Sequence, residues 1–124
     1  MSSPIDQMLE VYSAPVLEQW YKASIVLIVG EIQTDPFDAT WSDHEYAVSD
    51  EEGFRTNYQS RDFVFAITNP VFLDQTLKPR TGCRIMYTEN GVVKQFEIVP
   101  VGDRKAVEDM PGGYRWLVHT VQVA

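Results

Sequence analysis

The dipeptide Asn90-Gly91 constrains the fold more than any other feature of the sequence. It separates the runs 84–88 and 92–99, which both have the short length and apolar content of β-strands. Asn-Gly is the favoured two-residue connection of a β-hairpin, because a type I′ turn requires positive φ at both positions. The sequence therefore predicts a hairpin in which residues near 84–89 pair with residues near 92–98.

Further short strands are expected along the rest of the chain. Residues 25–29 are rich in β-branched side chains, and residues 54–65 form a longer run that ends in alternating phenylalanines. A final strand over 114–123 is partly apolar on both faces, which is typical of a central or sandwiched strand, and Trp116 is expected in the core. These strands predict a mainly β fold, a small antiparallel barrel or sandwich of about six or seven strands.

The N-terminal residues 1–22 have a different pattern and predict a short helical segment before a β domain of residues 24–124. Ser3 suits a helix cap and Pro4 suits the first helical position. Apolar residues then recur at helical spacing, although the part after Pro15 is also compatible with a strand. The length of 124 residues predicts a single domain, 1–124.

The start of the chain also bears on targeting. It lacks the basic and apolar regions of a signal peptide, so none is expected. The longest apolar runs are far shorter than the roughly 20 residues that a membrane-spanning helix requires. The sequence therefore predicts a chain that does not cross a membrane.

The negative charge of the chain is concentrated in one segment. The formal net charge is −8, and residues 31–62 carry nine acids against two arginines, whereas residues 63–124 carry six acids and seven bases. A nucleic-acid clamp is not expected, because phosphate binding requires a basic surface. The acidic segment either keeps the protein soluble, faces a basic partner, or lines a channel that must not retain a polyanion.

No sequence motif of catalytic or cofactor chemistry is present, since the chain lacks GxSxG, Walker, GxGxxG, HExxH and CxxC patterns. His44 is expected in a solvated loop rather than a metal site, because adjacent strand residues point to opposite faces. His119 is expected to be a hydrogen-bonded sheet histidine rather than a catalytic base. Cys83, the single cysteine, is expected to be a packed thiol. We therefore expect no catalytic residue, no cofactor and no metal site, and the chain is not expected to be an enzyme.

The charged connection over 101–113 is a candidate contact surface. It is longer than most connections in a small domain, and such a loop is either simply solvated or used for binding. The candidate residues for contact with a neighbouring molecule are Asp103, Arg104, Lys105, Glu108 and Asp109.

Two segments of the chain carry a recognisable pattern. The first comprises residues 46–53 and the run Ser-Arg-Asp-Phe-Val-Phe over 60–65. The second begins with Lys-Pro-Arg-Thr-Gly-Cys-Arg-Ile over 78–85 and continues through the Asn-Gly turn to Tyr-Arg-Trp and His-Thr within 114–120. This pattern resembles small phage-encoded proteins of the head–tail connection, in which an N-terminal helix precedes a strand, an "SRDF" strand, a "P-x-x-G-D-x-I" turn and an "R-x-x-IHT" final strand. The second segment is also similar to lambda-type head–tail joining proteins, which have a small β-barrel fold, and Cys83 stands where the connector pattern usually has an aspartate.

The resemblance covers roughly residues 24–124 and implies a virion structural protein at the phage head–tail interface. Such a protein forms a ring of copies that joins or closes the portal and connects to the tail. The implied partners are further copies, portal or adaptor proteins and tail proteins, and DNA passes without specific binding. The implied location is the virion, and the host cytoplasm during assembly. An acidic lumen would let DNA slide, and the candidate channel-lining acids are Asp43, Glu45, Asp50, Glu51 and Glu52.

Two other interpretations stay open. One is a tail terminator protein, and the other is a ligand-binding β-barrel module for a carbohydrate or peptide, with Trp20 or Trp41 exposed. An exposed aromatic platform beside a concave groove would favour the binding module. An acidic ring lumen with head-to-tail contacts would favour the connector.

Overall fold

The computed structural model describes residues 19–49 and 51–124. Over these residues the chain is mainly β, as the sequence predicts, and its strands pair antiparallel with their neighbours. The strands are β1 (Tyr21–Val29), β2 (Ile32–Gln33), β3 (Phe37–Ser49), β4 (Arg55–Ala66), β5 (Arg84–Glu89), β6 (Val92–Ile98), β7 (Val107–Asp109) and β8 (Arg115–Gln122). Two short 3₁₀ helices, η1 (Pro70–Leu73) and η2 (Gln75–Leu77), connect β4 to β5.

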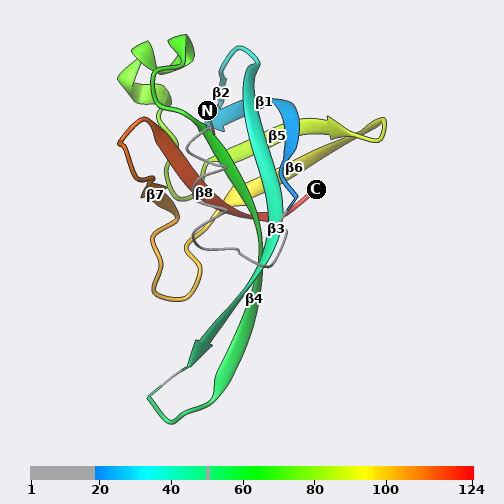
Figure 1. Cartoon of the computed structure of the whole chain (residues 1–124). Helices are drawn as coiled ribbons and strands as arrows, with labels where there is room; N and C mark the ends of the chain where they lie inside the picture. The colour runs from blue at the N-terminus through cyan, green and yellow to red at the C-terminus, as the bar shows by residue number, and fades with distance from the viewer. Residues whose placement is uncertain (1–18, 50) are drawn as a thin grey trace.

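Six of these strands close into a barrel (Figure 1). The order around the wall is β1-β3-β4-β8-β6-β5, and β5 returns to pair with β1, so the sheet has no beginning or end. The two remaining strands lie outside this path, with β2 on β1 and β7 on β8. The barrel of the sequence prediction is therefore confirmed, and the two short outer strands account for a strand number above the predicted six or seven.

The barrel interior is filled by large apolar side chains. Alternate residues of each strand point inward, which brings Phe63 and Phe65 of β4 together with Phe96 of β6 in one core cluster. Phe63 and Phe96 meet edge to face with their ring centroids 5.7 Å apart. Trp116 is 8% exposed and belongs to the same cluster, which confirms its predicted place in the core.

The predicted hairpin across Asn90-Gly91 is also confirmed. Residues Arg84–Glu89 pair with residues Val92–Ile98, and Glu89 lies opposite Val92. Asn90 and Gly91 have φ values of 52° and 79°, the left-handed conformations that the two-residue turn requires.

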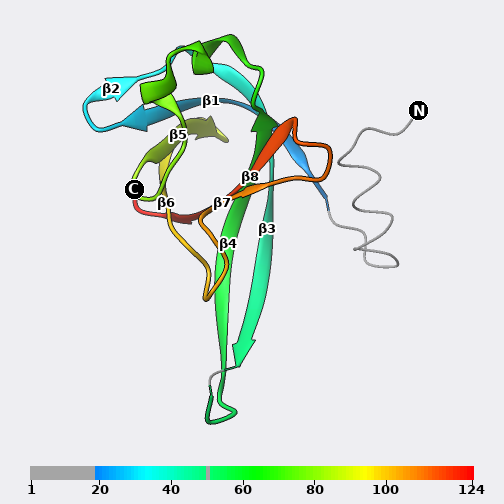
Figure 2. The same cartoon turned by 90° about the vertical axis from the view of Figure 1, so that its left-hand side faces the viewer.

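The two longest strands, β3 and β4, continue beyond the barrel as a two-stranded ribbon (Figures 1 and 2). On the barrel, β3 pairs with β1 only as far as Trp41, and β4 pairs with β8 only from Arg61 onward. Past those residues the two strands pair with each other out to Ser49 and Arg55. We call residues 43–49 and 51–60 the arm.

The loop between β6 and β8 folds against the outside of the barrel and against the β3 strand of the arm. Met110 packs with Val64 in a small second apolar cluster, joined by Trp20 and Leu117. Closer to the arm, an added Cβ on Gly102 would come within 2.6 Å of a Val48 methyl group. This loop is the residue range 99–114, and it covers one face of the sheet formed by β3, β4 and β8.

One part of the fold prediction is not supported. Of the predicted helical segment 1–22, residues 1–18 lie outside the described residues, and Tyr21 and Lys22 belong to β1 rather than to a helix. They pair with Trp41 and Thr40 of β3, so sheet pairing decides their conformation instead of the helical spacing of apolar residues.

Candidate functional site

The most concentrated polar chemistry of the described chain lies on the outer face of the β3-β4-β8 wall. Asp62 and His119 are both completely buried there, and they stand directly opposite each other on β4 and β8. Phe63 of β4 points into the barrel, so its neighbour Asp62 must point outward, toward the loop 99–114. We call the group gathered around these two residues the Asp62 cluster; it contains His44, Tyr46, Ser60, Asp62, Glu108 and His119.

Asp62 accepts hydrogen bonds from several elements at once. His119 Nδ1 lies 2.7 Å from Asp62 Oδ1, and the Ser60 hydroxyl donates to the same oxygen at 2.6 Å. The Tyr46 hydroxyl donates to Asp62 Oδ2, and His44 Nδ1 lies 2.9 Å from that oxygen. The carboxylate therefore ties together the strand that carries it, the central strand β8 and the base of the arm.

His119 connects this carboxylate to a second one. Its Nε2 lies 2.5 Å from Glu108 Oε2 on β7, so the imidazole sits between two acidic groups. Arg104 Nε lies 3.6 Å from the same Glu108 oxygen, and the Arg104 guanidinium lies 4.9 Å from the centre of the Tyr46 ring. The loop 99–114 is thus joined to the barrel by a chain of charged and polar contacts.

The electrostatics of the cluster favour an ionised Asp62, a protonated His119 and a neutral Tyr46. Burial alone opposes ionisation of Asp62, but hydrogen bonds from His119, His44 and Ser60 hold its pKa well below the usual range. Burial also works against a charged His119, yet Asp62 and Glu108 together raise the pKa of its ring. Burial and the neighbouring Asp62 raise the pKa of Tyr46, which therefore stays a hydrogen-bond donor.

The contacts of the cluster join separate elements of the fold. Both ring nitrogens of His119 are engaged by carboxylates, and the ring is fully buried, so it has no nitrogen left to accept a proton from a bound molecule. Ser60 bonds to Asp62 rather than to an imidazole. Over the described ranges, no group of three or more His, Cys, Asp or Glu side chains is placed to hold a metal ion.

A second polar group closes the arm end of the barrel. Arg61 points inward from β4, and its guanidinium lies 3.8 Å from the centre of the Trp41 ring. It makes two bonds to the Asp43 carboxylate, at 2.8 and 3.0 Å, and one to Glu89 at 2.6 Å. Burial lowers the pKa of Arg61, but the hydrogen bonds to Asp43 and Glu89 outweigh burial, so the pKa of Arg61 is raised. Burial raises the pKa of the adjacent Tyr87 to about 12. Arg61 is therefore a permanently charged cap over the aromatic core.

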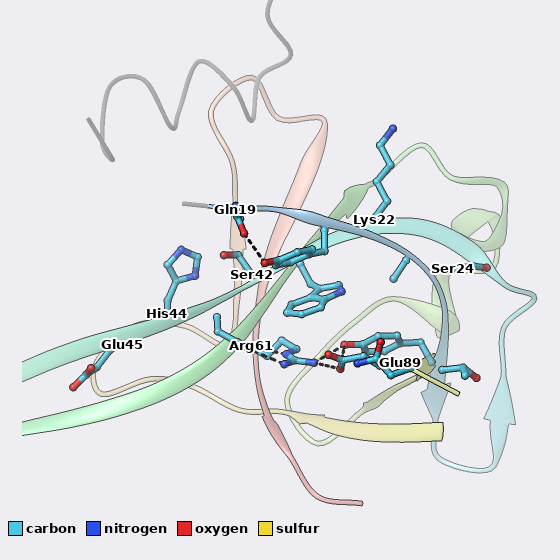
Figure 3. A pocket seen from close by; sticks show the side chains of 15 residues that line it. Gln19, Lys22, Ser24, Ser42, His44, Glu45, Arg61 and Glu89 are labelled. Atoms are coloured by element: carbon cyan, nitrogen blue, oxygen red, sulfur yellow. Dashed lines mark hydrogen bonds and ion pairs between the residues drawn. The ribbon is translucent and has the colours of Figure 1, made fainter. Parts of the chain in front are cut away.

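An open cleft lies beside this cap, between β1 and the end of β5 (Figure 3). β1 pairs with β5 only through residues 26–28. The backbone N–H and C=O of Leu27 bond to Thr34, so they point toward the β2 and β3 side of β1. Backbone groups of successive strand residues point to opposite sides, so those of Lys22 and Ser24 point the other way, toward the cleft. Among the described residues, no strand pairs with this edge of β1 at Lys22 and Ser24. On its other edge, the same part of β1 pairs with β3.

Two of the three predictions for the histidines and the cysteine are confirmed, and one is wrong. His119 is a hydrogen-bonded sheet histidine and Cys83 is a buried thiol just before β5, and both predictions are confirmed. The expectation that His44 lies in a solvated loop is wrong. His44 lies on β3, and its ring stands 5.5 Å from that of Trp20 and next to Asp62.

Four of the five acids proposed to line a channel lie on the arm. Asp43 and Glu45 are exposed on the face of β3 that continues the barrel interior, and Asp43 is ion-paired with Arg61. Glu51 and Glu52 are exposed in the turn at the end of the arm, and Asp50 lies outside the described residues.

The residues proposed to contact a neighbour divide into two groups. Glu108 and Arg104 are engaged within the chain through His119 and Tyr46. Asp103, Lys105 and Asp109 are exposed on the loop surface. The tryptophans Trp41 and Trp116 are buried and Trp20 is half-buried against Val64 and Met110, so none of them forms an exposed aromatic platform.

Sequence reasoning did not identify the Asp62 cluster as a unit. One signal was present, because Asp62 interrupts the apolar run 63–65 at a position that must face away from its phenylalanines. The matching signal was His119 among the apolar residues of the final strand. What joins them is the pairing of β4 with β8 across 57 residues of sequence, which no local pattern specifies.

No protein-family model matches the chain, and no curated protein gives a significant match. In the part of the chain that the structure describes, no helix is long and apolar enough to span a membrane.

Proposed function

We propose that the chain is a virion structural protein at the phage head–tail interface, where copies form a ring that joins or closes the portal and connects to the tail. The observation that carries the proposal is the arm. It is a two-stranded ribbon that projects from a closed barrel, and beyond Trp41 and Arg61 its outer edges pair with no other described strand. The small barrel and the sequence pattern of the connector proteins add to it.

A projecting ribbon of this kind is expected to be covered in an assembly. Two strands alone are marginally stable in water, and long unpaired strand edges invite association with other chains. On one face the loop 99–114 supports the β3 strand of the arm through Tyr46 and Val48. The opposite face, which carries Asp43, Glu45 and Ala47, is exposed along its length. This face and the arm edges are the surfaces we assign to neighbouring copies and to the channel.

The charge of the arm suits a channel that DNA must traverse. Asp43, Glu45, Glu51 and Glu52 stand on or at the end of the arm, and Asp50 belongs to the same segment by sequence. In a ring every copy repeats these charges, so a modest excess per chain becomes a strong negative potential in the lumen. A negative wall repels DNA phosphates and does not retain them, whereas a basic wall would hold DNA through many contacts. The exposed loop residues Asp103, Lys105 and Asp109 are then left for contacts with portal, adaptor or tail proteins.

The decisive experiment locates the chain in particles. The tagged chain is produced from the genome that encodes it, in infected cells, and released particles are imaged by electron cryomicroscopy. We expect a ring of this barrel at the portal vertex, with the arms directed at the channel and Glu45 and Glu51 on its wall. Particles without the chain would contradict the connector assignment. A ring with Lys94, Arg104 and Lys105 on the bore and the acids outside would contradict the electrostatic part.

A matched pair of charge reversals separates the role of the arm from general effects of charge. Glu45→Lys with Glu51→Lys places two cations on the arm, and Glu31→Lys with Asp35→Lys places two on the exposed β1–β2 end of the barrel. We expect particles with the arm variant to assemble but to deliver DNA poorly. The barrel-end variant should deliver DNA normally. Equal defects in both would contradict a channel-lining role for the arm acids.

A further inference from the structure

Both ring nitrogens of His119 face carboxylate oxygens. Its two ring nitrogens lie 2.7 Å from an oxygen of Asp62 and 2.5 Å from an oxygen of Glu108. An ionised carboxylate only accepts hydrogen bonds, and a neutral imidazole carries a single N–H, so both contacts are satisfied only when both nitrogens are protonated. Arg104 Nε lies 3.6 Å from the same Glu108 oxygen.

We propose that protonated His119 is a pH-sensitive lock, which holds the loop 99–114 against the barrel and releases it when the ring loses its proton. The proposal rests on the fold and is independent of the function proposed above. Asp62 and Glu108 raise the pKa of His119, which is the direction that this proposal requires.

Charged and titratable groups approach the ring from each element packed against it. Asp62 approaches from β4, Glu108 from β7 and Tyr46 from β3, where its ring stands edge-on at 5.3 Å. Behind them, His44 contacts Asp62, and Arg104 contacts Glu108. From the β6 side the contact is to the backbone, where the Val99 N–H donates to the His119 carbonyl at 3.0 Å.

The architecture decides which contact fails when the proton is lost. A neutral His119 would turn a lone pair toward one of the two carboxylates, at a distance where that contact is repulsive. Asp62 is fixed by Ser60, Tyr46 and His44, and it is completely buried. Glu108 belongs to the three-residue strand β7, and its side chain is 28% exposed. Glu108 is therefore the group that moves, and β7 moves with it.

The release has a defined extent. Glu108 stands between Val107 and Asp109, which pair with Val118 and Trp116 of β8. The same loop continues to Arg104 over the Tyr46 ring and to Gly102 against Val48. Loss of the His119–Glu108 bond thus loosens β7 and the support of the arm, while the β1–β5 side of the barrel is untouched.

The first test measures the protonation of the ring directly in the full chain. Nitrogen-15 NMR of the imidazole distinguishes a doubly protonated ring from either neutral tautomer. We expect His119 to be doubly protonated at neutral pH and to titrate above the ordinary histidine range. Amide signals of 101–110 and 44–48 should shift with the same midpoint, whereas those of 25–29 and 84–86 should not. A neutral ring at neutral pH would overturn the proposal, as would a ring that titrates without any response of the loop.

Two variants make the test specific. In Glu108→Gln the amide can accept a bond from a protonated Nε2 or donate one to a neutral Nε2, so the loop stays attached in both states. We expect this variant to lose the pH response of 101–110 and to lower the His119 midpoint. Asp109→Asn removes the same charge from the neighbouring exposed position and should retain the wild-type response. A Glu108→Gln variant with the wild-type pH response would refute the lock.

Discussion

At the scale of single residues, the molecule depends on one buried carboxylate that satisfies partners from three strands. Asp62 receives His119 from β8, Ser60 from its own strand and Tyr46 and His44 from β3. A buried charge with this many donors stays ionised, and removing it leaves those donors without their acceptor.

The first prediction follows from that dependence. Asp62→Ala leaves the buried His119 facing Glu108 alone and should lower the free energy of unfolding by about 3–5 kcal/mol, the usual cost of breaking a buried ion pair. Asp38→Ala removes an exposed acid of β3 and should change it by less than about 0.5 kcal/mol. Urea unfolding followed by tryptophan fluorescence measures both. Equal, small effects would contradict the role assigned to Asp62.

The second prediction concerns the pH dependence of stability. The pKa of Asp62 is lower in the folded chain than its ordinary value of 3.8, so its contribution is present above that value and is lost as pH falls through the folded pKa. The pKa of His119 is raised above its ordinary 6.5, so its contribution is complete below that value and is lost as pH rises through the folded pKa. The free energy of unfolding should therefore decline at both ends of a pH series. In His119→Gln the decline on the alkaline side should be smaller than in the wild type.

At the scale of elements, the contact between the loop 99–114 and the arm depends on one glycine. Gly102 has φ of +58°, and a Cβ there would stand 2.6 Å from a Val48 methyl group. Gly53, at the end of the arm, has φ of +86° but open space around it. A side chain at either position would have to adopt the left-handed backbone conformation, which costs stability. Only at Gly102 would the added Cβ also clash with Val48.

The third prediction uses this pair. Gly53→Ala should cost about 1–2 kcal/mol of stability, the penalty of a left-handed alanine. Gly102→Ala should cost more, because Val48 or the loop must also move. Adding Val48→Ala to Gly102→Ala should recover the excess, and chemical denaturation of all variants measures the coupling. If Gly102→Ala costs no more than Gly53→Ala, the loop does not press on the arm as described.

Local chemistry accounts for the elements that could be predicted from the sequence. The hairpin across Asn90-Gly91 was predictable because two adjacent residues specify the turn, and the burial of Trp116 followed from alternation within one strand. The Asp62 cluster was not, because it requires the registers of β3, β4 and β8 together. The arm also lacked a local signature, although the polar run Arg-Thr-Asn-Tyr-Gln-Ser over 55–60 distinguishes it from the apolar 63–65.

At the scale of the whole molecule, we expect the barrel and the arm to be separable in stability. The core side chains lie on the barrel side of Arg61, and the arm contributes none of them. The arm is thus expected to be dispensable for folding and required for assembly.

The fourth prediction tests that separation. Tyr46 and Tyr58 are register partners across the arm, so replacing residues 47–57 with Asn-Gly joins them by a two-residue hairpin turn and keeps the Tyr46–Asp62 bond. The shortened chain should stay folded by circular dichroism and lose only about 1 kcal/mol of stability. It should fail to enter particles in the imaging experiment described above. A shortened chain that does not fold would show that the arm belongs to the core, and one that enters particles normally would remove the arm from assembly.

The position of β8 has a consequence for synthesis on the ribosome. β8 is the last strand in sequence, yet it inserts between β4 and β6 in the middle of the wall. Until β8 has left the exit tunnel, the edge of β4 that it covers in the folded barrel stays bare. Such edges are prone to pair with other nascent chains on the same polysome. Slow translation of the codons before β8 should therefore increase aggregation of the nascent chains.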